Sequence, residues 1–281
     1  MKQKLRKLVE RARRGKSVRW PWFAPRVKNP VAWLPTDRTG WTVHRDVALR
    51  LKNLSIDERG TLGDDPGNEA GTFKIRLAAV PEARREAVAL VRQRYKSRGY
   101  LTSATLVHDN VCTFSASDEG TLAGTVSVRL DSATGLAADL LFRAETDALR
   151  AEGRKVCEFI RLAVNTSHAS QPVLAGLFHT VFLFAQRVRG FDFVLIEVNP
   201  RHVGYYRRTL GFGVIGSERH NQRVNAPAVL MGVSFADIAD KLHRHAGKGA
   251  RAALARNLYE YGFSPAEEDG ILGRLRVLEV G

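Results

Sequence analysis

The sequence predicts an α/β fold with a mixed central sheet flanked by helices, and three observations indicate it. From residue 72 onward, short segments of strand-like hydrophobic pattern alternate with longer segments of helical pattern that end at glycine. A turn-forming stretch at 117–120 joins two strands directly, which indicates a hairpin. The resulting order is β-α-β-β-α-β-α-β-α-β-β. A doubly wound sheet would not place a hairpin between its first two helices, so we expect a mixed sheet.

Each element has its own signal in the sequence. Residues 72–79 alternate apolar and polar side chains, as in a strand with one buried face. Pro81 then marks the start of a helix at about 82–98, because proline suits the first helical turn, and Gly99 ends that helix. The same reasoning places strands at 106–115 and 120–131, a helix at 140–152, a strand at 156–164, a helix at 173–189, a strand at 191–198, a short helix at 203–210, and strands at 212–216 and 223–233.

Composition divides the 281 residues into three regions. Residues 1–70 form a basic N-terminal extension that ends in a turn-rich linker, residues 71–234 carry the α/β domain, and residues 235–281 form a C-terminal helical segment. The formal net charge is +15, and residues 1–30 hold eleven basic residues against one acidic residue. The excess charge is therefore a property of the extension, in which residues 2–14 have the apolar spacing of an amphipathic helix.

The basic extension allows three interpretations. It docks an acidic protein, lies on an anionic membrane, or remains a solvated tail, and charge alone does not choose among them. We expect no nucleic-acid partner, because the chain shows no zinc-finger, RNP-like or helix-turn-helix pattern and its charge lies in a tail.

Cysteine use and hydropathy predict a cytoplasmic protein without a metal. Cys112 and Cys157 are far apart in apolar surroundings, and no His/Cys cluster accompanies them, so we expect two buried thiols and no metal site. The N-terminus lacks the apolar core of a secretory signal, and the longest apolar stretch, 173–185, is too short to span a bilayer. The one membrane role we expect is peripheral contact at the inner face through residues 1–30.

Two short segments give the domain its first family resemblance. Pro200-Arg201-His202 is followed closely by Tyr205-Tyr206-Arg207-Arg208-Thr209-Leu210-Gly211-Phe212. With the element order, these segments resemble the GNAT acyltransferase fold, in which a Tyr…Gly-Phe segment follows the fifth strand. The resemblance implies a splayed, GNAT-like central sheet and a tyrosine that protonates the leaving thiol.

Three further segments narrow the resemblance to one family. They are Arg92-x-x-Tyr95-x-x-x-Gly99-Tyr100, Gly124-Thr125-x-x-x-Arg129-Leu130-Asp131-x-x-x-Gly135-Leu136 and Glu158-x-x-Arg161. Across about residues 72–233 the chain is similar to N-acyl amino acid synthases of the long-chain N-acyl tyrosine synthase kind, which are themselves similar to acyl-homoserine lactone synthases. The resemblance implies transfer of a fatty acyl group from a carrier-protein thioester to the α-amino group of an amino acid.

One departure from other GNAT enzymes bears on the acyl donor. Coenzyme A-dependent members carry a Q/R-x-x-G-x-G/A loop whose backbone N–H groups cradle the pyrophosphate. In the corresponding stretch, 165–176, Gln171 is followed three residues later by Leu174 instead of glycine. We therefore expect the acyl-phosphopantetheine arm to arrive on an acyl carrier protein, with no tightly bound cofactor. Such carrier proteins are acidic, so a basic surface suits them.

Aminolysis of a thioester requires a deprotonated amine and a proton for the departing thiol. Glu158 is the first candidate base, because an acid is out of place in an otherwise apolar strand unless it is paired. An ion pair with Arg129 or Arg161 is the structural alternative. Tyr206 is the candidate acid, and the adjacent Tyr205 is the competing choice.

Other polar residues are candidates for the site. Asp109 resembles an acid of the lactone synthases and is a second candidate base, although an Asp there also suits a turn. Arg129 and Arg161 are candidates to bind a carboxylate, and exposed strand arginines are the alternative. Arg92 and Tyr95 lie one helical turn apart, on a face that the resemblance places beside the acyl and acceptor pockets. A solvated helix face is the alternative for this pair.

An acyl chain requires an apolar slot. The helix at 173–189 is apolar nearly all round, which suits either the wall of such a slot or simple core packing. The candidate residues for the wall are Leu177, Phe178, Val181 and Phe182.

Two other functions are open on the sequence alone. An acyl-homoserine lactone synthase would use S-adenosylmethionine as acceptor, but those proteins are usually shorter and carry a fuller acidic cluster than Asp109 provides. A non-catalytic GNAT-like binding module would keep the fold without the chemistry.

Overall fold

A computed structural model describes residues 55–57, 72–101, 110–118, 120–165, 171–246 and 257–276. The predicted helix at 2–14, the linker that begins at residue 60, and Asp109 lie outside these residues, as do loop residues 166–170. The division of the chain into three regions therefore stays a prediction.

Within the described residues, eight strands form one sheet in the order β1-β2-β3-β4-β5-β6-β8-β7. Neighbouring strands are antiparallel except for β5 and β6, which are parallel, so the expected mixed sheet is confirmed. From β2 onward the elements follow one another in the predicted order. The strands are β1 Ser55–Asp57, β2 Thr72–Leu77, β3 Val111–Asp118, β4 Thr121–Leu130, β5 Val156–Val164, β6 Phe193–Val198, β7 Gly213–Asn221 and β8 Ala226–Ser234.

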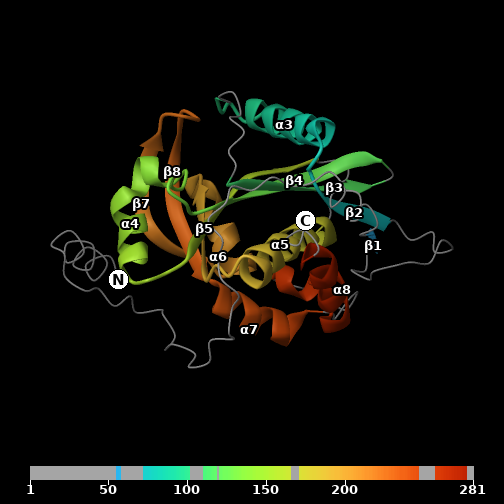
Figure 1. The fold of residues 1–281 in the computed structure, drawn as a ribbon. Coiled ribbons are helices and arrows are strands. Elements are labelled where there is room, and N and C mark those ends of the chain that lie inside the picture. The colour runs from blue at the N-terminus through green and yellow to red at the C-terminus, as the bar shows by residue number, and fades with distance from the viewer. Residues whose placement is uncertain are drawn as a thin grey trace.

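Helices cover both faces of the sheet. Figure 1 shows α3 on one face and α5, α7 and α8 on the other. Gly99 and Gly190 follow α3 and η2 with φ angles of 74° and 69°, because glycine adopts this left-handed conformation without a Cβ clash. The helices are α3 Pro81–Lys96, α4 Asp139–Ala151, α5 Gln171–Leu183, the π-helical η2 Phe184–Val188, the 3₁₀ turn η3 Pro200–His202, α6 Val203–Thr209, α7 Phe235–His245, the 3₁₀ turn η5 Leu258–Tyr261 and α8 Pro265–Arg276.

Two elements differ from their predicted form. The helix expected at 173–189 changes from α-helical to π-helical hydrogen bonding after Leu183. The strand expected at 212–216 continues to Asn221 as β7. β7 is the edge strand of the sheet, so the polar run at 217–220 faces largely toward solvent without breaking the strand.

β5 and β6 separate at the middle of the sheet. They pair over three positions only, the last being Glu158 with Leu195, although both strands continue. Just beyond this point β5 carries a bulge against β4, where three steps along β5 match two along β4. Arg161 lies in the bulge with a φ of 55°, which is uncommon for a residue other than glycine. A bulge bends its strand and increases its twist, so β5 leaves β6 and space opens between them.

The C-terminal segment packs beneath α5. η5 and α8 contact α5, and α7 contacts η5 and β8. Ten of the 13 residues of α5 are therefore buried. His179 of α5 links the two parts, because its Nδ1 accepts a hydrogen bond from the Phe263 N–H at 2.9 Å and its ring stacks on Phe263. None of the helices in the described part of the chain has the length and hydropathy needed to cross a bilayer.

Candidate active site

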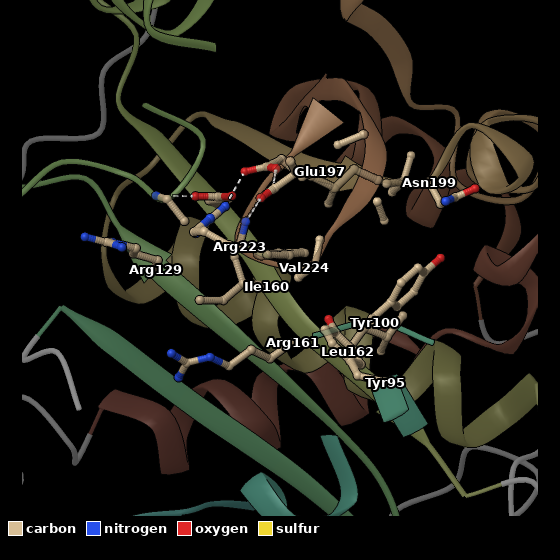
Figure 2. Close-up of a pocket in the computed structure, with 18 of the residues that line it drawn as sticks. Tyr95, Tyr100, Arg129, Ile160, Arg161, Leu162, Glu197, Asn199, Arg223 and Val224 are labelled. Carbon is tan, nitrogen blue, oxygen red and sulfur yellow. Dashed lines mark hydrogen bonds and ion pairs between the residues drawn. The ribbon is translucent and has the colours of Figure 1, made fainter. Parts of the chain in front are cut away.

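A cavity of about 590 Å³ lies where β5 and β6 separate. Its wall comes from α3, from β4, β5 and β6, from the loop that leads into α4 and the first turns of α4, from α5 and α6, and from the β7–β8 turn with the start of β8. Figure 2 shows Arg129 and Arg161 on one side of this space and Tyr95 and Tyr100 on the other. The cavity brings together seven of the eleven predicted site residues, namely Arg92, Tyr95, Arg129, Glu158, Arg161, Phe178 and Tyr206.

Glu158 lies at the last position where β5 pairs with β6, and it is only 1% exposed. Its Oε2 accepts hydrogen bonds from the backbone N–H groups of Ala137 at 2.7 Å and Ala138 at 3.1 Å. Its Oε1 receives no hydrogen bond from the residues that the structure describes, and the residue lines the cavity. Backbone amides, and not Arg129 or Arg161, are therefore the partners of this carboxylate.

The proton affinity of Glu158 suits acid–base chemistry. Burial raises its pKa to about 8, and the nearby Glu197 carboxylate adds to the increase. The Ala137 and Ala138 amides and the charge of Arg223 oppose the increase only in part. A carboxyl group with a pKa near neutrality accepts and releases a proton within the working range of most enzymes.

A network of charged side chains holds the loop that supplies these amides. Arg150 of α4 donates to Asp131 at 2.6 and 2.9 Å and to Asp139 at 2.8 and 3.0 Å. Asp139 in turn accepts a hydrogen bond from the Leu136 N–H at 2.9 Å. Burial, the largest single influence, raises the pKa of Asp139, but the hydrogen bonds from Arg150, Thr146 and the Leu136 N–H together with the charge of Arg150 outweigh it, so the pKa lies below its ordinary value. The loop between β4 and α4 is thereby fixed at both ends.

We expect Arg150→Met to lower the free energy of unfolding by about 2 kcal/mol, because it leaves the buried Asp139 carboxylate without its cation. Urea denaturation measures the loss. Arg85→Met is the matched control, since Arg85 pairs with Glu82 on the exposed surface of α3 and should cost no more than about 0.5 kcal/mol. Equal losses in the two variants would show that the network does not hold the loop.

Sequence reasoning missed a second acid in the cavity. Glu197 lies on β6 two residues beyond Leu195, the last residue that pairs with β5, and it lines the wall. Its Oε2 accepts a hydrogen bond from Asn221 Nδ2 at 2.6 Å, and its Oε1 pairs with Arg223 at 2.9 Å (Figure 2). Burial raises the pKa of Glu197, and the charge of Arg223 limits the increase. The signal that could have identified Glu197 is the same as for Glu158, a lone acid in an apolar strand. Its partners Asn221 and Arg223 could not be predicted, because no local sequence pattern connects them to β6.

Arg129 and Arg161 bring two positive charges to the cavity. Arg129 is the β4 neighbour of Glu158, and its Nε is buried without a hydrogen-bond partner. The one hydrogen bond that its side chain makes to a described residue runs from Nη2 to the Thr134 carbonyl at 3.3 Å. Burial lowers the pKa of Arg161, and the charges of Arg129 and Arg223 add to the effect. Neither Arg129 nor Arg161 pairs with an acid among the described residues, so both can receive an anion.

The two adjacent tyrosines of α6 have different surroundings. Tyr206 lines the cavity and packs against Phe212, whereas Tyr205 is 36% exposed and is not part of the wall. Burial raises the pKa of the Tyr206 phenol, and the nearby Tyr205 and Tyr95 add to the increase, so the phenol keeps its proton. The Tyr206 hydroxyl makes no hydrogen bond to the described residues, which leaves it free to donate. This geometry favours Tyr206 over Tyr205.

The predicted acyl wall is only partly formed by α5. Phe178 lines the cavity, whereas Leu177 and Val181 lie in the hydrophobic core. Phe182 does not line this cavity but lines a smaller one on the far side of Phe178. The reason is that the sheet and the C-terminal segment together bury α5 on nearly all sides. Apolar residues of β5 and β6 take over this part of the wall, and they include Leu162, Ile196 and Val198.

A sequence model of the N-acyl amino acid synthase FeeM matches residues 86–234. The chain belongs to this family. The solved structure of FeeM, an N-acyl amino acid synthase from uncultured soil microbes, matches with 29% sequence identity and a TM-score of 0.56, over 60% of this chain and 94% of that one. A putative N-acetyltransferase from Lactobacillus plantarum shows 18% identity and a TM-score of 0.43, over 58% of this chain and 98% of its own. No curated protein sequence matches.

Membership in the FeeM family makes this chain an acyltransferase and confirms both the GNAT-like fold and the resemblance read from its motifs. Glu158, Tyr206, Arg129 and Arg161 all lie within the matched residues. The match ends at residue 234, the last residue of β8. α7, η5 and α8 therefore lie beyond the segment that defines the FeeM family.

Proposed function

We propose that this FeeM-family protein transfers a fatty acyl group from an acyl carrier protein thioester to the α-amino group of an amino acid. The observation that carries the proposal is the placement of Glu158 and Tyr206 on the wall of one cavity, each with an oxygen that no described residue engages. One is a carboxyl group with a pKa of about 8, and the other is a phenol that stays protonated. Aminolysis of a thioester needs this pair.

The charges of the cavity suit an amino acid as acceptor. Glu158 and Glu197 offer carboxylates to an ammonium group, and Arg129 and Arg161 offer guanidinium groups to a carboxylate. A free amino acid carries both of these groups on one carbon atom. Binding at both ends would fix its nitrogen near the opening between β5 and β6.

In the proposed reaction, Glu158 takes a proton from the bound ammonium through Oε1. The neutral amine then attacks the thioester carbonyl carbon, forming a C–N bond and a tetrahedral oxyanion. As the tetrahedral intermediate collapses, the C–S bond breaks and Tyr206 donates its proton to the departing sulfur. The nitrogen gives its second proton to the Tyr206 phenolate, and the proton on Glu158 passes to solvent, so the products are the neutral N-acyl amide, the free thiol of the phosphopantetheine arm and one released proton.

Two features support a carrier protein as donor. Gln171 and Leu174 of α5 stand where coenzyme A-dependent enzymes have their pyrophosphate-binding glycine pattern. Arg92 and Arg98 are exposed, and both line the cavity from the α3 side. Exposed cations beside an active-site opening attract an acidic carrier protein.

Purified protein incubated with a fatty acyl carrier protein and each of the common amino acids, with products read by mass spectrometry, tests the proposal. We expect N-acyl amino acid, with higher kcat/KM for the carrier-bound thioester than for the matched fatty acyl-coenzyme A. S-adenosylmethionine as acceptor and acetyl-coenzyme A as donor are the contrasting arms. The proposal would be refuted if turnover required S-adenosylmethionine as the acceptor, or if it required acetyl-coenzyme A as the donor.

A further inference from the structure

A second, smaller cavity of about 30 Å³ lies under the first one, between α5 and the C-terminal segment. Its wall includes Phe159 of β5, Phe178 of α5, and residues of α7 and η5. The residues contributed by the C-terminal segment are Ile238, Leu242, Leu258, Tyr259 and Gly262. These residues lie beyond the segment that the family model matches.

Two phenylalanines separate the small cavity from the active-site cavity. Phe159 and Phe178 line both, and their ring centroids are 6.3 Å apart. Each is 7% exposed. The two cavities therefore meet at a wall one aromatic layer thick. Phenylalanine rings at such a wall shift their rotamers without breaking any hydrogen bond.

The small cavity presents hydrocarbon to its interior. Two polar groups on its wall are engaged, because His179 Nδ1 accepts from the Phe263 N–H at 2.9 Å and the Tyr259 hydroxyl donates to the Leu210 carbonyl at 2.7 Å. His179 Nε2 lies 3.0 Å from Glu268 Oε1 without forming a hydrogen bond, and the other side chains of the wall are hydrocarbon. Cavities lined mainly by hydrocarbon stay dry and take up apolar ligands. A volume of about 30 Å³ accommodates the end of a hydrocarbon chain.

We infer that the methyl end of the fatty acyl chain passes between Phe159 and Phe178 into this small cavity, and that the C-terminal segment sets the longest chain accepted. The inference rests on the proposed function. The active-site cavity holds the thioester and the first part of the chain along β5 and β6. α7 and η5 then close its far end, so the segment beyond the family match acts on substrate choice.

Two substitutions change the small cavity in opposite directions. Ala175→Val adds two carbon atoms to a position on its wall, and Leu242→Ala removes three. With carrier-bound saturated acyl groups of graded length, we expect Ala175→Val to lower the kcat/KM ratio of the longest accepted chain to octanoyl by about tenfold. We expect Leu242→Ala to raise that ratio and to extend the accepted length by about two carbons.

Leu275→Ala is the matched control, because Leu275 is buried in α8 of the same segment and does not line the cavity. It should weaken folding and leave the chain-length profile unchanged. An unchanged profile in both cavity variants, or the same shift in Leu275→Ala, would overturn the inference.

A binding measurement separates this inference from the proposed reaction. Calorimetric titration of the full chain with free saturated fatty acids of graded length should show the same shifts in limit for Ala175→Val and Leu242→Ala. These shifts without any acyl transfer to amino acids would mean that the reaction is wrong and the subsite is right. Acyl transfer to amino acids, with the same chain-length limit for fatty-acid binding in all variants, would mean that the reaction is right and the subsite is wrong.

Discussion

We expect the Glu158→Gln variant to lose acyl transfer by about 10²–10⁴-fold in kcat, the usual range for removal of a general base. Glutamine keeps the shape and can still accept the hydrogen bonds of Ala137 and Ala138 through its carbonyl oxygen. It cannot take a proton from the acceptor ammonium. The variant should therefore fold and bind an amino acid while failing in the chemical step.

The pH profile identifies the lost group. Because the pKa of Glu158 is about 8, its basic form accumulates as pH rises, and kcat/KM of the natural protein should increase with an inflection near 8. Glu158→Gln should lack this inflection. Glu267→Gln is the matched control, since Glu267 is a buried carboxylate that binds Ser264 away from the cavity. A full rate with the inflection intact in Glu158→Gln would exclude Glu158 as the base.

The second large effect is expected for Tyr206→Phe, with kcat about 10²-fold lower because the departing thiolate receives no proton. Tyr205→Phe is the matched control, because it also removes a phenolic hydroxyl but at a residue outside the cavity wall. This variant should retain the natural kcat.

The leaving group gives an independent readout for Tyr206. An aryl thioester releases a more acidic thiol, which leaves readily without a proton donor. The loss caused by Tyr206→Phe should therefore be much smaller with an aryl thioester than with the pantetheine thioester. Equal losses with both donors would assign Tyr206 a role in packing instead of proton transfer.

The order of elements was readable from the sequence because each signal acts locally. Proline at the start of α3, glycine after α3 and η2, and two-residue alternation in β2 are decided by neighbouring backbone geometry. The length of β7 was not predicted, since a polar run is compatible with a strand only when that strand lies at an edge. Edge position is a property of the whole sheet and has no local signal.

The candidate site was predicted in part for the same reason. An acid in an apolar strand marks Glu158 locally, but the amides of Ala137 and Ala138 reach it only through tertiary structure. Glu197 carried a similar mark and was missed. The acyl wall assigned to Leu177, Val181 and Phe182 depended on which side of α5 faces the cavity, and a helix that is apolar all round does not encode that.

The buried carboxyl group of Glu158 makes the stability of the native state depend on pH. Below about pH 4.5, folded and unfolded chains both hold this proton; between that value and about 8, unfolding releases it, so alkali progressively weakens the fold. The pH values at which Glu158 is deprotonated and can act as a base are thus those at which it contributes least to the free energy of unfolding. A cationic acceptor bound in the cavity would raise the free energy of unfolding again, so substrate stabilises the enzyme most in the pH range where activity is highest.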